Sequence, residues 1–236
     1  MNESTFQYIG TELSLFSKAI NWKTYFSGFL RPLLVGRVLE VGAGIGSTTK
    51  ALCDGTQQDW TCLEPDAELA LTLHCKILSG ELPKCCRVQN SQAKDLSTDA
   101  QYDTILYIDV LEHVQDDSEE LSIIANHLAP GGFLAILAPA HQFLFSEFDQ
   151  AIGHCRRYNL KSMERAVPCS LTGIRLCYLD SFGLIASIAN KTLSRQSMPT
   201  VRQIEFWDRH LIPLSRIFDW FIHYRIGKSV IGIWKK

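Results

Sequence analysis

The stretch Val38-Leu39-Glu40-Val41-Gly42-Ala43-Gly44-Ile45-Gly46 decides the fold that this sequence predicts. The apolar run from Arg37 to Val41 is typical of a buried strand, and residues Thr48 to Cys53 have a helical pattern. The glycines between them lack a Cβ, so the backbone there can approach a ligand closely. The stretch therefore predicts a nucleoside-binding loop between a strand and a helix.

Strands and helices alternate along the chain on both sides of this loop. Three further apolar runs and a closing run predict strands at 60–64, 102–108, 133–138 and 229–234. Helical patterns cover 67–78 and 118–128, and Pro130-Gly131-Gly132 ends the second of these. Alternation at this spacing predicts a doubly wound α/β fold, with a parallel sheet covered by helices on both faces.

Length and composition predict one globular domain over residues 1–236. The chain is 46% hydrophobic and 20% charged, and its net charge of -2 provides no general attraction to nucleic acid. The eight cysteines contain no C-x-x-C pair, so we interpret them as reduced thiols and expect no metal site. Met1 to Gly10 is polar and acidic rather than typical of a secretory signal, which favours a cytoplasmic protein.

The flanking regions predict additions to the core at residues 36–140. Aromatic residues at helical spacing in Phe6 to Leu30 predict a helical cap within residues 1–35, lying over the carboxyl edge of the sheet. Residues 141–236 are expected to supply a substrate loop at His141 to Met163, C-terminal helices and the last strands.

The C-terminal region has a stripe of apolar residues and an excess of basic ones. Pro213 predicts two short helices here, with a stripe that packs on the sheet or roofs the pocket, formed by Trp207, Leu211, Leu214, Phe218 and Phe221. Seven Lys/Arg and three Asp/Glu between Val201 and Lys236 leave open contact with an anionic membrane or a lipid-like substrate. No run of 18 apolar residues predicts a transmembrane segment.

The charges around the glycine loop favour a cationic nucleoside over a dinucleotide. A dinucleotide site usually has the spacing G-x-G-x-x-G, which would put a glycine at Ser47. Glu40 would repel a pyrophosphate and attract the ammonium or sulfonium of S-adenosylmethionine, and Asp109 and Glu112 extend the acidic edge. Glu64 can accept hydrogen bonds from the ribose of either cofactor.

Four motifs in order, from Val38 to Ala140, resemble the core of the class I S-adenosylmethionine-dependent methyltransferases. They are residues 38–46, Leu63-Glu64-Pro65-Asp66, the segment 107–114 and Leu128-Ala129-Pro130-Gly131-Gly132. The resemblance implies a mostly parallel, seven-stranded Rossmann-like sheet with S-adenosyl-L-methionine as cofactor.

The same resemblance implies contacts for each part of the cofactor. The methionine part would be held by Glu40, Gly42, Ala43, Gly44 and Gly46, and its amino region by Asp109. The ribose would be held by Glu64, and the adenine edge by Gln92 and Ala93. The expected set of cofactor contacts also includes Pro65 and Val110. Many relatives have an acidic residue in place of Gln92, although glutamine also offers adenine a donor and an acceptor.

The segment after the fourth predicted strand offers candidate catalytic and substrate-binding groups. Its Gly153-His154-Cys155-Arg156-Arg157-Tyr158 resembles a bacterial methyltransferase subgroup with a G-H-x-R-R-Y signature. Candidate proton acceptors are His113, His141, Asp149 and His154, and candidate substrate ligands are Arg156, Arg157 and Tyr158. Two alternatives are structural: Arg156 and Asp149 pair to fix the loop, and His113 caps a local turn.

The sequence thus predicts methyl transfer from S-adenosylmethionine to an O, N or C atom of a small molecule by in-line displacement. Lipid- or sugar-linked acceptors are among the candidates. Two other hypotheses remain open at this point: an NAD-dependent oxidoreductase and a non-catalytic scaffold that binds S-adenosylmethionine.

Overall fold

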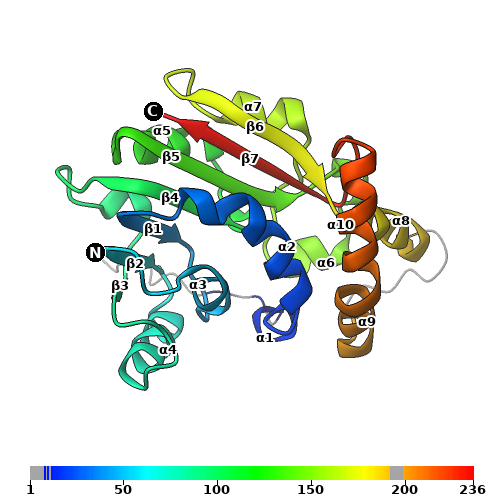
Figure 1. Cartoon of the computed structure of the whole chain (residues 1–236), viewed down its shortest axis with the longest axis horizontal. Coiled ribbons are helices and arrows are strands. Elements are labelled where there is room, and N and C mark those ends of the chain that lie inside the picture. The colour runs from blue at the N-terminus through cyan, green and yellow to red at the C-terminus, as the bar shows by residue number, and fades with distance from the viewer. Residues whose placement is uncertain (1–7, 9, 11, 192–198) are drawn as a thin grey trace.

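The computed structural model describes residues 8, 10, 12–191 and 199–236, and within them the chain forms one seven-stranded sheet (Figure 1). The strand order is β3-β2-β1-β4-β5-β7-β6, parallel from β3 to β5, with β7 antiparallel to both β5 and β6. The strands are β1 (Arg37–Val41), β2 (Asp59–Leu63), β3 (Cys86–Gln89), β4 (Tyr102–Ile108), β5 (Leu128–Pro139), β6 (Thr172–Leu179) and β7 (Ser229–Lys235). The predicted doubly wound, mostly parallel sheet is confirmed.

Helices cover both faces of the sheet. Figure 1 shows α1, α2 and α3 on the near face and α5 and α7 behind the sheet. The helices are α1 (Leu13–Phe16), α2 (Ile20–Leu30), α3 (Ser47–Leu52), α4 (Ala67–Leu78), α5 (Asp117–Asn126), α6 (Glu147–Ala151), α7 (Leu160–Ala166), α8 (Ser181–Ala189), α9 (Val201–Phe206) and α10 (Ile212–Phe221). None of the described helices has the length and apolar character needed to cross a bilayer.

Alternating side chains of the central strands build two separate cores. In β1, Val38 packs into the core beneath α2 and α3, whereas Leu39 packs into the core beneath α5 and α7. In β4, Leu106 and Ile105 divide between the two cores in the same way. A strand buried on both faces has no polar side, which explains why its sequence is a continuous apolar run.

The predicted strands differ from the observed ones at the start of β5 and at the two outer strands of the sheet, β3 and β6. β5 begins at Leu128, so the segment Pro130-Gly131-Gly132 lies inside a long strand rather than before it. β3 is four residues long, and β6 is largely exposed along its first half, so neither has the apolar run that marks the central strands.

The C-terminal helices form one continuous helical run instead of two short helices. A π-helical segment, Trp207–Leu211, joins α9 directly to α10, and Pro213 lies in the first turn of α10. Proline has no amide hydrogen to donate, and the change of hydrogen-bond register at the π segment accommodates it without ending the helix.

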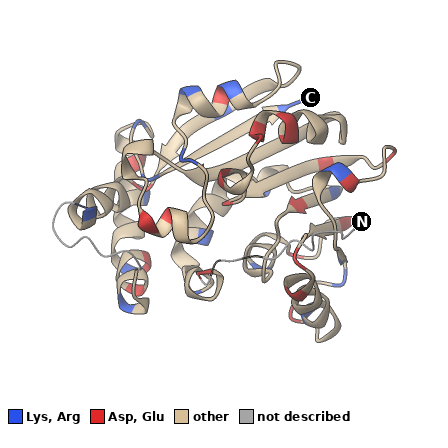
Figure 2. Ribbon diagram, turned by 180° about the vertical axis from the view of Figure 1, so that it is seen from behind, with Lys and Arg blue, Asp and Glu red and all other residues tan. Residues whose placement is uncertain are grey.

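Charged residues of both signs are distributed over the molecule. Viewed from behind, Lys and Arg residues appear on several separate elements (Figure 2). Acidic residues are concentrated in the first turn of α5, at Asp117, Glu119 and Glu120, where the partial positive charge of a helix N-terminus stabilises them.

Candidate active site

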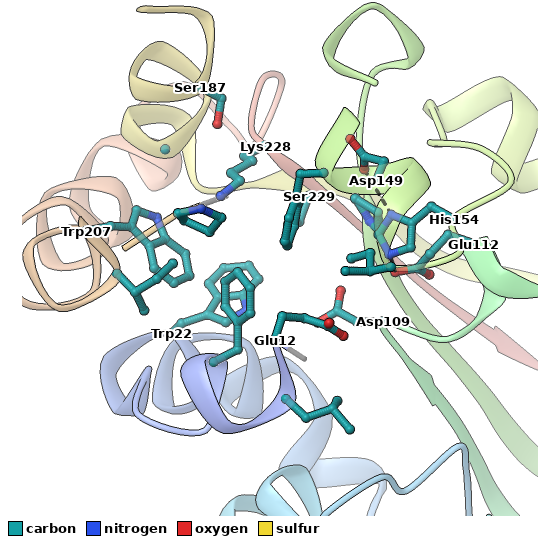
Figure 3. A pocket seen from close by; sticks show the side chains of 18 of the residues that line it. Glu12, Trp22, Asp109, Glu112, Asp149, His154, Ser187, Trp207, Lys228 and Ser229 are labelled. Carbon is teal, nitrogen blue, oxygen red and sulfur yellow. Dashed lines mark hydrogen bonds and ion pairs between the residues drawn. The ribbon is translucent and has the colours of Figure 1, made fainter. Parts of the chain in front are cut away.

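A cavity of about 810 Å³ lies where the carboxyl ends of β1 and β4 meet the added N- and C-terminal helices. Such a volume is within the range that small-molecule sites occupy. In Figure 3 the side chains of Asp149, His154 and Glu112 lie on one side of the cavity, and those of Trp207 and Lys228 lie on the other. Carboxyl edges of parallel strands are the usual place for ligands in α/β sheets.

The glycine loop forms one wall of this cavity through Gly42, Ala43, Gly44 and Ile45. Gly42, Gly44 and Gly46 all have positive φ, of 66°, 56° and 77°, which favours glycine. The loop amides are bonded within the protein: Gly42 and Ala43 donate to the Leu63 carbonyl at 2.8 and 3.2 Å, and Gly44 donates to Glu64 Oε2 at 2.7 Å. These three amides therefore have acceptors already and do not form a free cradle for a diphosphate.

Glu40 lies behind the loop and does not line the cavity, which differs from the direct cofactor contact expected of it. Its Oε2 accepts hydrogen bonds from Thr49 Oγ1 at 2.7 Å and from Trp60 Nε1 at 2.9 Å. Burial raises the pKa of Glu40 to about 7, although both hydrogen bonds oppose this shift. The side chain thus ties α3 and β2 to the strand that carries the glycine loop.

Four further residues expected to contact the cofactor do not line the cavity. Glu64 is buried and accepts from the Gly44 and Asp66 amides, which holds the glycine loop against the end of β2. Gln92 and Asp95 form a reciprocal cap on a short 3-10 turn, Ala93–Asp95, in which Ala93 is buried. Pro65 follows Glu64, and its carbonyl accepts from Asn90. The predicted ribose and adenine contacts of these residues remain predictions.

Asp109 and Val110 follow β4 and lie next to the loop. Asp109 lines the cavity with a φ of 55°, and Val110 packs against Gly42, where an added Cβ would lie 2.6 Å from Val110 Cγ2. The side chain is exposed within the cavity, where the surrounding protein reduces its hydration and raises the pKa of Asp109 to about 6, against the opposing charges of His154, Lys23 and Lys228.

Asp149 organises the other side of the cavity. Its Oδ1 accepts from His154 Nδ1 at 2.9 Å and from Arg157 Nε at 2.8 Å, and its Oδ2 accepts from Arg157 Nη2 at 3.0 Å and from Ser146. Burial alone would raise the pKa of Asp149, but the bonds from His154 and Arg157 outweigh it and hold the pKa well below its usual range. Asp149 is therefore an ionised group that orients His154.

His154 is held between two buried carboxyl groups. With Nδ1 directed at Asp149, its Nε2 lies 3.7 Å from Glu112 Oε1. Glu112 is fully buried, and neither of its carboxyl oxygens has a hydrogen-bond partner in the described part of the chain. Burial and the charge of Asp109 raise the pKa of Glu112 well above its usual range. The sequence indicated Glu112 only as part of an acidic edge, because no local motif pairs it with His154.

His113 also lines the cavity, edge to face with His154 at a centroid distance of 4.6 Å. Burial and the neighbouring His154 lower its pKa to about 4, so His113 is neutral at physiological pH. The nitrogens and oxygens of Glu112, His113 and His154 lie within 4.8 Å of one another, as do the thiols of Cys53, Cys85 and Cys86. Neither cluster could be predicted from the spacing of these residues along the chain.

The G-H-x-R-R-Y segment divides its side chains between two places. His154 and Arg157 face Asp149 and the cavity. Arg156 instead pairs with Asp117 at 2.8 Å, and the buried Tyr158 donates to the same carboxylate at 2.7 Å. A carboxylate-arginine pair does fix this loop. Asp149 pairs with Arg157, however, and not with Arg156 as expected, because Arg156 points away from the cavity.

His141 lies outside the cavity, contrary to its expected role as a proton acceptor there. Its Nε2 lies 2.9 Å from the Gly227 carbonyl, and its ring stacks on Tyr178 at a centroid distance of 4.9 Å. These contacts occupy the side chain, so His141 connects the end of β5 to the approach of β7.

Sequence reasoning missed several residues that line the cavity from distant parts of the chain. Lys228 precedes β7, and its Nζ lies 4.8 Å above the Trp207 ring. Lys23 and Trp22 enter from α2, where the Asp208 carboxylate accepts from the Trp22 amide at 2.8 Å. No local motif surrounds these residues, so only the folded chain places them together.

The comparisons with known proteins assign the family. The sequence model of a family described as a methyltransferase domain matches residues 12–169. The chain belongs to this methyltransferase-domain family. The class I methyltransferase predicted from the sequence motifs is thereby confirmed. No curated protein sequence matches the methyltransferase significantly.

Solved structures share the fold of the methyltransferase at low sequence identity. An S-adenosylmethionine-dependent methyltransferase from Clostridium acetobutylicum is 12% identical, with a TM-score of 0.58 over 91% of this chain and 90% of that one. A phosphoethanolamine N-methyltransferase from Haemonchus contortus is 14% identical, with a TM-score of 0.64 over 96% of this chain and 57% of that one. The [4+2]-cyclase SpnF is 13% identical, with a TM-score of 0.62 over 92% and 81%. The cyclase illustrates that the fold alone does not fix the reaction.

Proposed function

We propose that this methyltransferase binds S-adenosyl-L-methionine against the glycine loop and methylates an O, N or C atom of an acceptor held in the adjoining cavity. The observation that carries the proposal is the bonding of the loop amides inside the protein, next to the acidic side chain of Asp109. A pyrophosphate needs free donors and positive charge, whereas a cationic amino acid nucleoside is attracted by carboxylates. This argument favours S-adenosylmethionine over NAD.

The residues around the loop suit the parts of this cofactor. Gly44 has no Cβ, so the backbone leaves room for a ligand, and Asp109 would attract the methionine ammonium group. Glu64 and Pro65, with Gln92 and Ala93, would border the ribose and adenine, and Val110 supports Gly42 from behind. When bound, the cofactor supplies an electrophilic methyl group with a neutral thioether as leaving group.

His154 is the group that we expect to accept a proton from the acceptor. Asp149 fixes the imidazole through Nδ1, and Nε2, which lies 3.7 Å from Glu112 Oε1, is the ring nitrogen left to receive a proton. An acceptor O–H or N–H would transfer its proton to this Nε2 while its lone pair forms the bond to the methyl carbon. His113 and Glu112 complete the wall around this position, and Arg157 positions Asp149. The main contribution of the protein is to align the two reactants and exclude water.

The acceptor is a small molecule with a large apolar part. Aromatic and aliphatic side chains line part of the cavity, including those of Trp22, Phe26, Trp207 and Leu211. Lys228 lies among them and offers one positive charge to an acidic group of the acceptor. A lipid-linked acceptor fits this lining better than a free sugar does.

Thermal unfolding with added ligands tests the cofactor. S-adenosylmethionine and S-adenosylhomocysteine should raise the melting temperature by several degrees at about 100 times their Kd, while NAD should leave it unchanged. Stabilisation by NAD alone would establish the oxidoreductase instead. Incubation with methyl-labelled cofactor and a lipid extract should then move label into product, and binding without any transfer would support the non-catalytic scaffold.

A further inference from the structure

One helix at the edge of the molecule carries its apolar side outward. In α10, the side chains that face the protein are Ile212, Ser215 and Asp219, which are buried. The stripe on the opposite side is 41% to 65% exposed and consists of Leu214, Ile217, Phe218 and Phe221. Spacings of three and four put these residues on one face of the helix. The sequence predicted that Leu214, Phe218 and Phe221 pack on the sheet or roof the pocket. Their outward orientation in the structure corrects this prediction.

Buried polar contacts hold the helix in this orientation. Asp219 accepts hydrogen bonds from Tyr25 Oη at 2.8 Å and from the Asp180 and Ser181 amides at 2.7 and 3.1 Å. Ser215 donates to Asp180 Oδ1 at 2.7 Å. Buried polar groups require such partners, so rotating the helix to bury its apolar stripe would leave them unpaired. The exposed stripe is therefore a fixed feature of the fold.

A neighbouring helix enlarges the apolar area. α8 packs beside α10, with the Phe182 ring 5.6 Å from that of Phe218, and Ile185 is 57% exposed (Figure 1). We name the resulting patch the apolar surface; its residues are Ile185, Leu214, Ile217, Phe218, Trp220 and Phe221. A contiguous area of this kind usually marks an interaction site.

The exposed charges of the segment that contains α10 have one sign. Between Trp207 and Gly227 the only acidic residues are Asp208 and Asp219, and both are buried, whereas the adjoining helix α9 carries one exposed acidic residue, Glu205. The arginines of this segment, Arg209, Arg216 and Arg225, are all exposed. Trp220 lies one turn after Arg216, on the flank of α10 between the apolar stripe and the buried side. Exposed tryptophan and arginine on a helix with an apolar face are typical of helices that lie in a membrane interface.

We propose that the apolar surface docks this methyltransferase on an anionic phospholipid bilayer, with α10 lying in the interface. The exposed stripe would enter the boundary between headgroups and acyl chains, and the arginines would contact anionic headgroups. α8 also lines the cavity, through Gly183, Ala186 and Ser187, so one helix separates the cavity from the apolar surface. If the proposed function holds, a lipid-linked acceptor needs to travel only about the width of a helix, roughly 10 Å, from bilayer to cavity.

Tryptophan fluorescence provides a direct measurement. Of the five tryptophans, Trp22, Trp60, Trp207 and Trp234 are at most 8% exposed, whereas Trp220 is 62% exposed. Vesicles of phosphatidylcholine with phosphatidylglycerol, made with brominated acyl chains, should therefore quench mainly Trp220. The measurement uses the full chain without cofactor, so its failure is distinguishable from failure of methyl transfer. We expect co-sedimentation with these vesicles that weakens with added salt, and little with phosphatidylcholine alone.

Surface variants locate the contact. Ile217→Ser with Phe221→Ser, and separately Arg216→Glu with Arg225→Glu, should each weaken vesicle binding by at least about tenfold. Leu71→Ser and Lys84→Glu change exposed residues elsewhere and should leave binding unchanged. Melting temperatures check that the variants remain folded, which the exposure of the substituted residues favours.

Three outcomes would overturn the proposal. The first is an absence of quenching and co-sedimentation with anionic vesicles. The second is binding that the two surface variants and the two controls change equally. The third is self-association in sedimentation velocity that Ile217→Ser with Phe221→Ser abolishes, because a second copy of the chain would then cover the apolar surface.

Discussion

The carboxylate of Asp149 and the imidazole of His154 lie 2.9 Å apart, Oδ1 to Nδ1, in the wall of the cavity. Arg157 and Ser146 occupy the remaining positions around the same carboxylate, so its orientation is fixed from three directions. An ionised carboxylate in this position selects the imidazole tautomer with a proton on Nδ1, so the lone pair of Nε2 is the basic site of the ring.

Asp149→Asn tests this relationship. The amide cannot accept from His154 and Arg157 in the same way, so kcat should fall by about 100-fold or more while the Kd for S-adenosylmethionine stays nearly constant. Steady-state kinetics and calorimetry measure the two quantities. The matched control is Asp117→Asn, because Asp117 pairs with Arg156 outside the cavity. Equal losses of kcat in both variants would contradict a special role for Asp149.

Gly44→Ala tests the position of the cofactor. An added Cβ would lie 3.6 Å from the Leu13 methyl groups, an ordinary contact, so the variant should fold with a cost of about 1 to 2 kcal/mol for its positive φ. The same methyl group would project into the space beside the loop and should weaken S-adenosylmethionine binding by at least about tenfold. Calorimetry gives the Kd. A change below about twofold would place the cofactor elsewhere.

Gly46→Ala provides the contrasting case. Here the added Cβ would lie 2.7 Å from Leu73 Cδ2 inside the core. We therefore expect a larger loss in the free energy of unfolding than for Gly44→Ala, measured by urea denaturation. The reverse order of stability would mean that the loop does not pack as described.

Glu40→Gln tests the buried carboxyl group behind the loop. Because burial raises the pKa of Glu40 to about 7, the folded state binds more protons than the unfolded state above the ordinary pKa of 4.5. The contribution of Glu40 to the free energy of unfolding is thus fully present below about pH 4.5 and is lost as the pH rises through 7. Glutamine resembles the protonated form, so the variant should gain stability relative to the parent as pH increases from 5 to 8. Parallel stability curves for the two proteins would contradict the shifted pKa.

Asp219→Ala tests the anchor of α10. The substitution leaves the Asp180 and Ser181 amides without acceptors in a buried place and should reduce the free energy of unfolding by about 3 kcal/mol. Tyr25→Phe removes one hydrogen bond to the same carboxylate and should cost about 1 kcal/mol. In the double variant the two losses should not add, because both act on Asp219. Urea denaturation gives all three values, and full additivity would contradict the shared contact.

Local sequence was sufficient for the central part of the fold. The glycine loop, the strands at β1 and β4 and the helix at α4 were predictable because their signals lie within a few consecutive residues: apolar runs, glycines and helical periodicity. Asp109 could be placed beside the loop by the same reasoning, since parallel strands end at one edge of the sheet.

The sequence by itself determined which side chains share a face of a helix or strand, but tertiary structure decided what each face contacts. Arg156 and Arg157 are neighbours with the same chemistry, yet only Arg157 reaches Asp149. The periodicity of α10 marked an apolar face, yet Asp180 and Tyr25 hold the opposite, polar face against the protein. Periodicity is a property of the local backbone, whereas burial depends on partners that are far away in the chain and meet only when it folds.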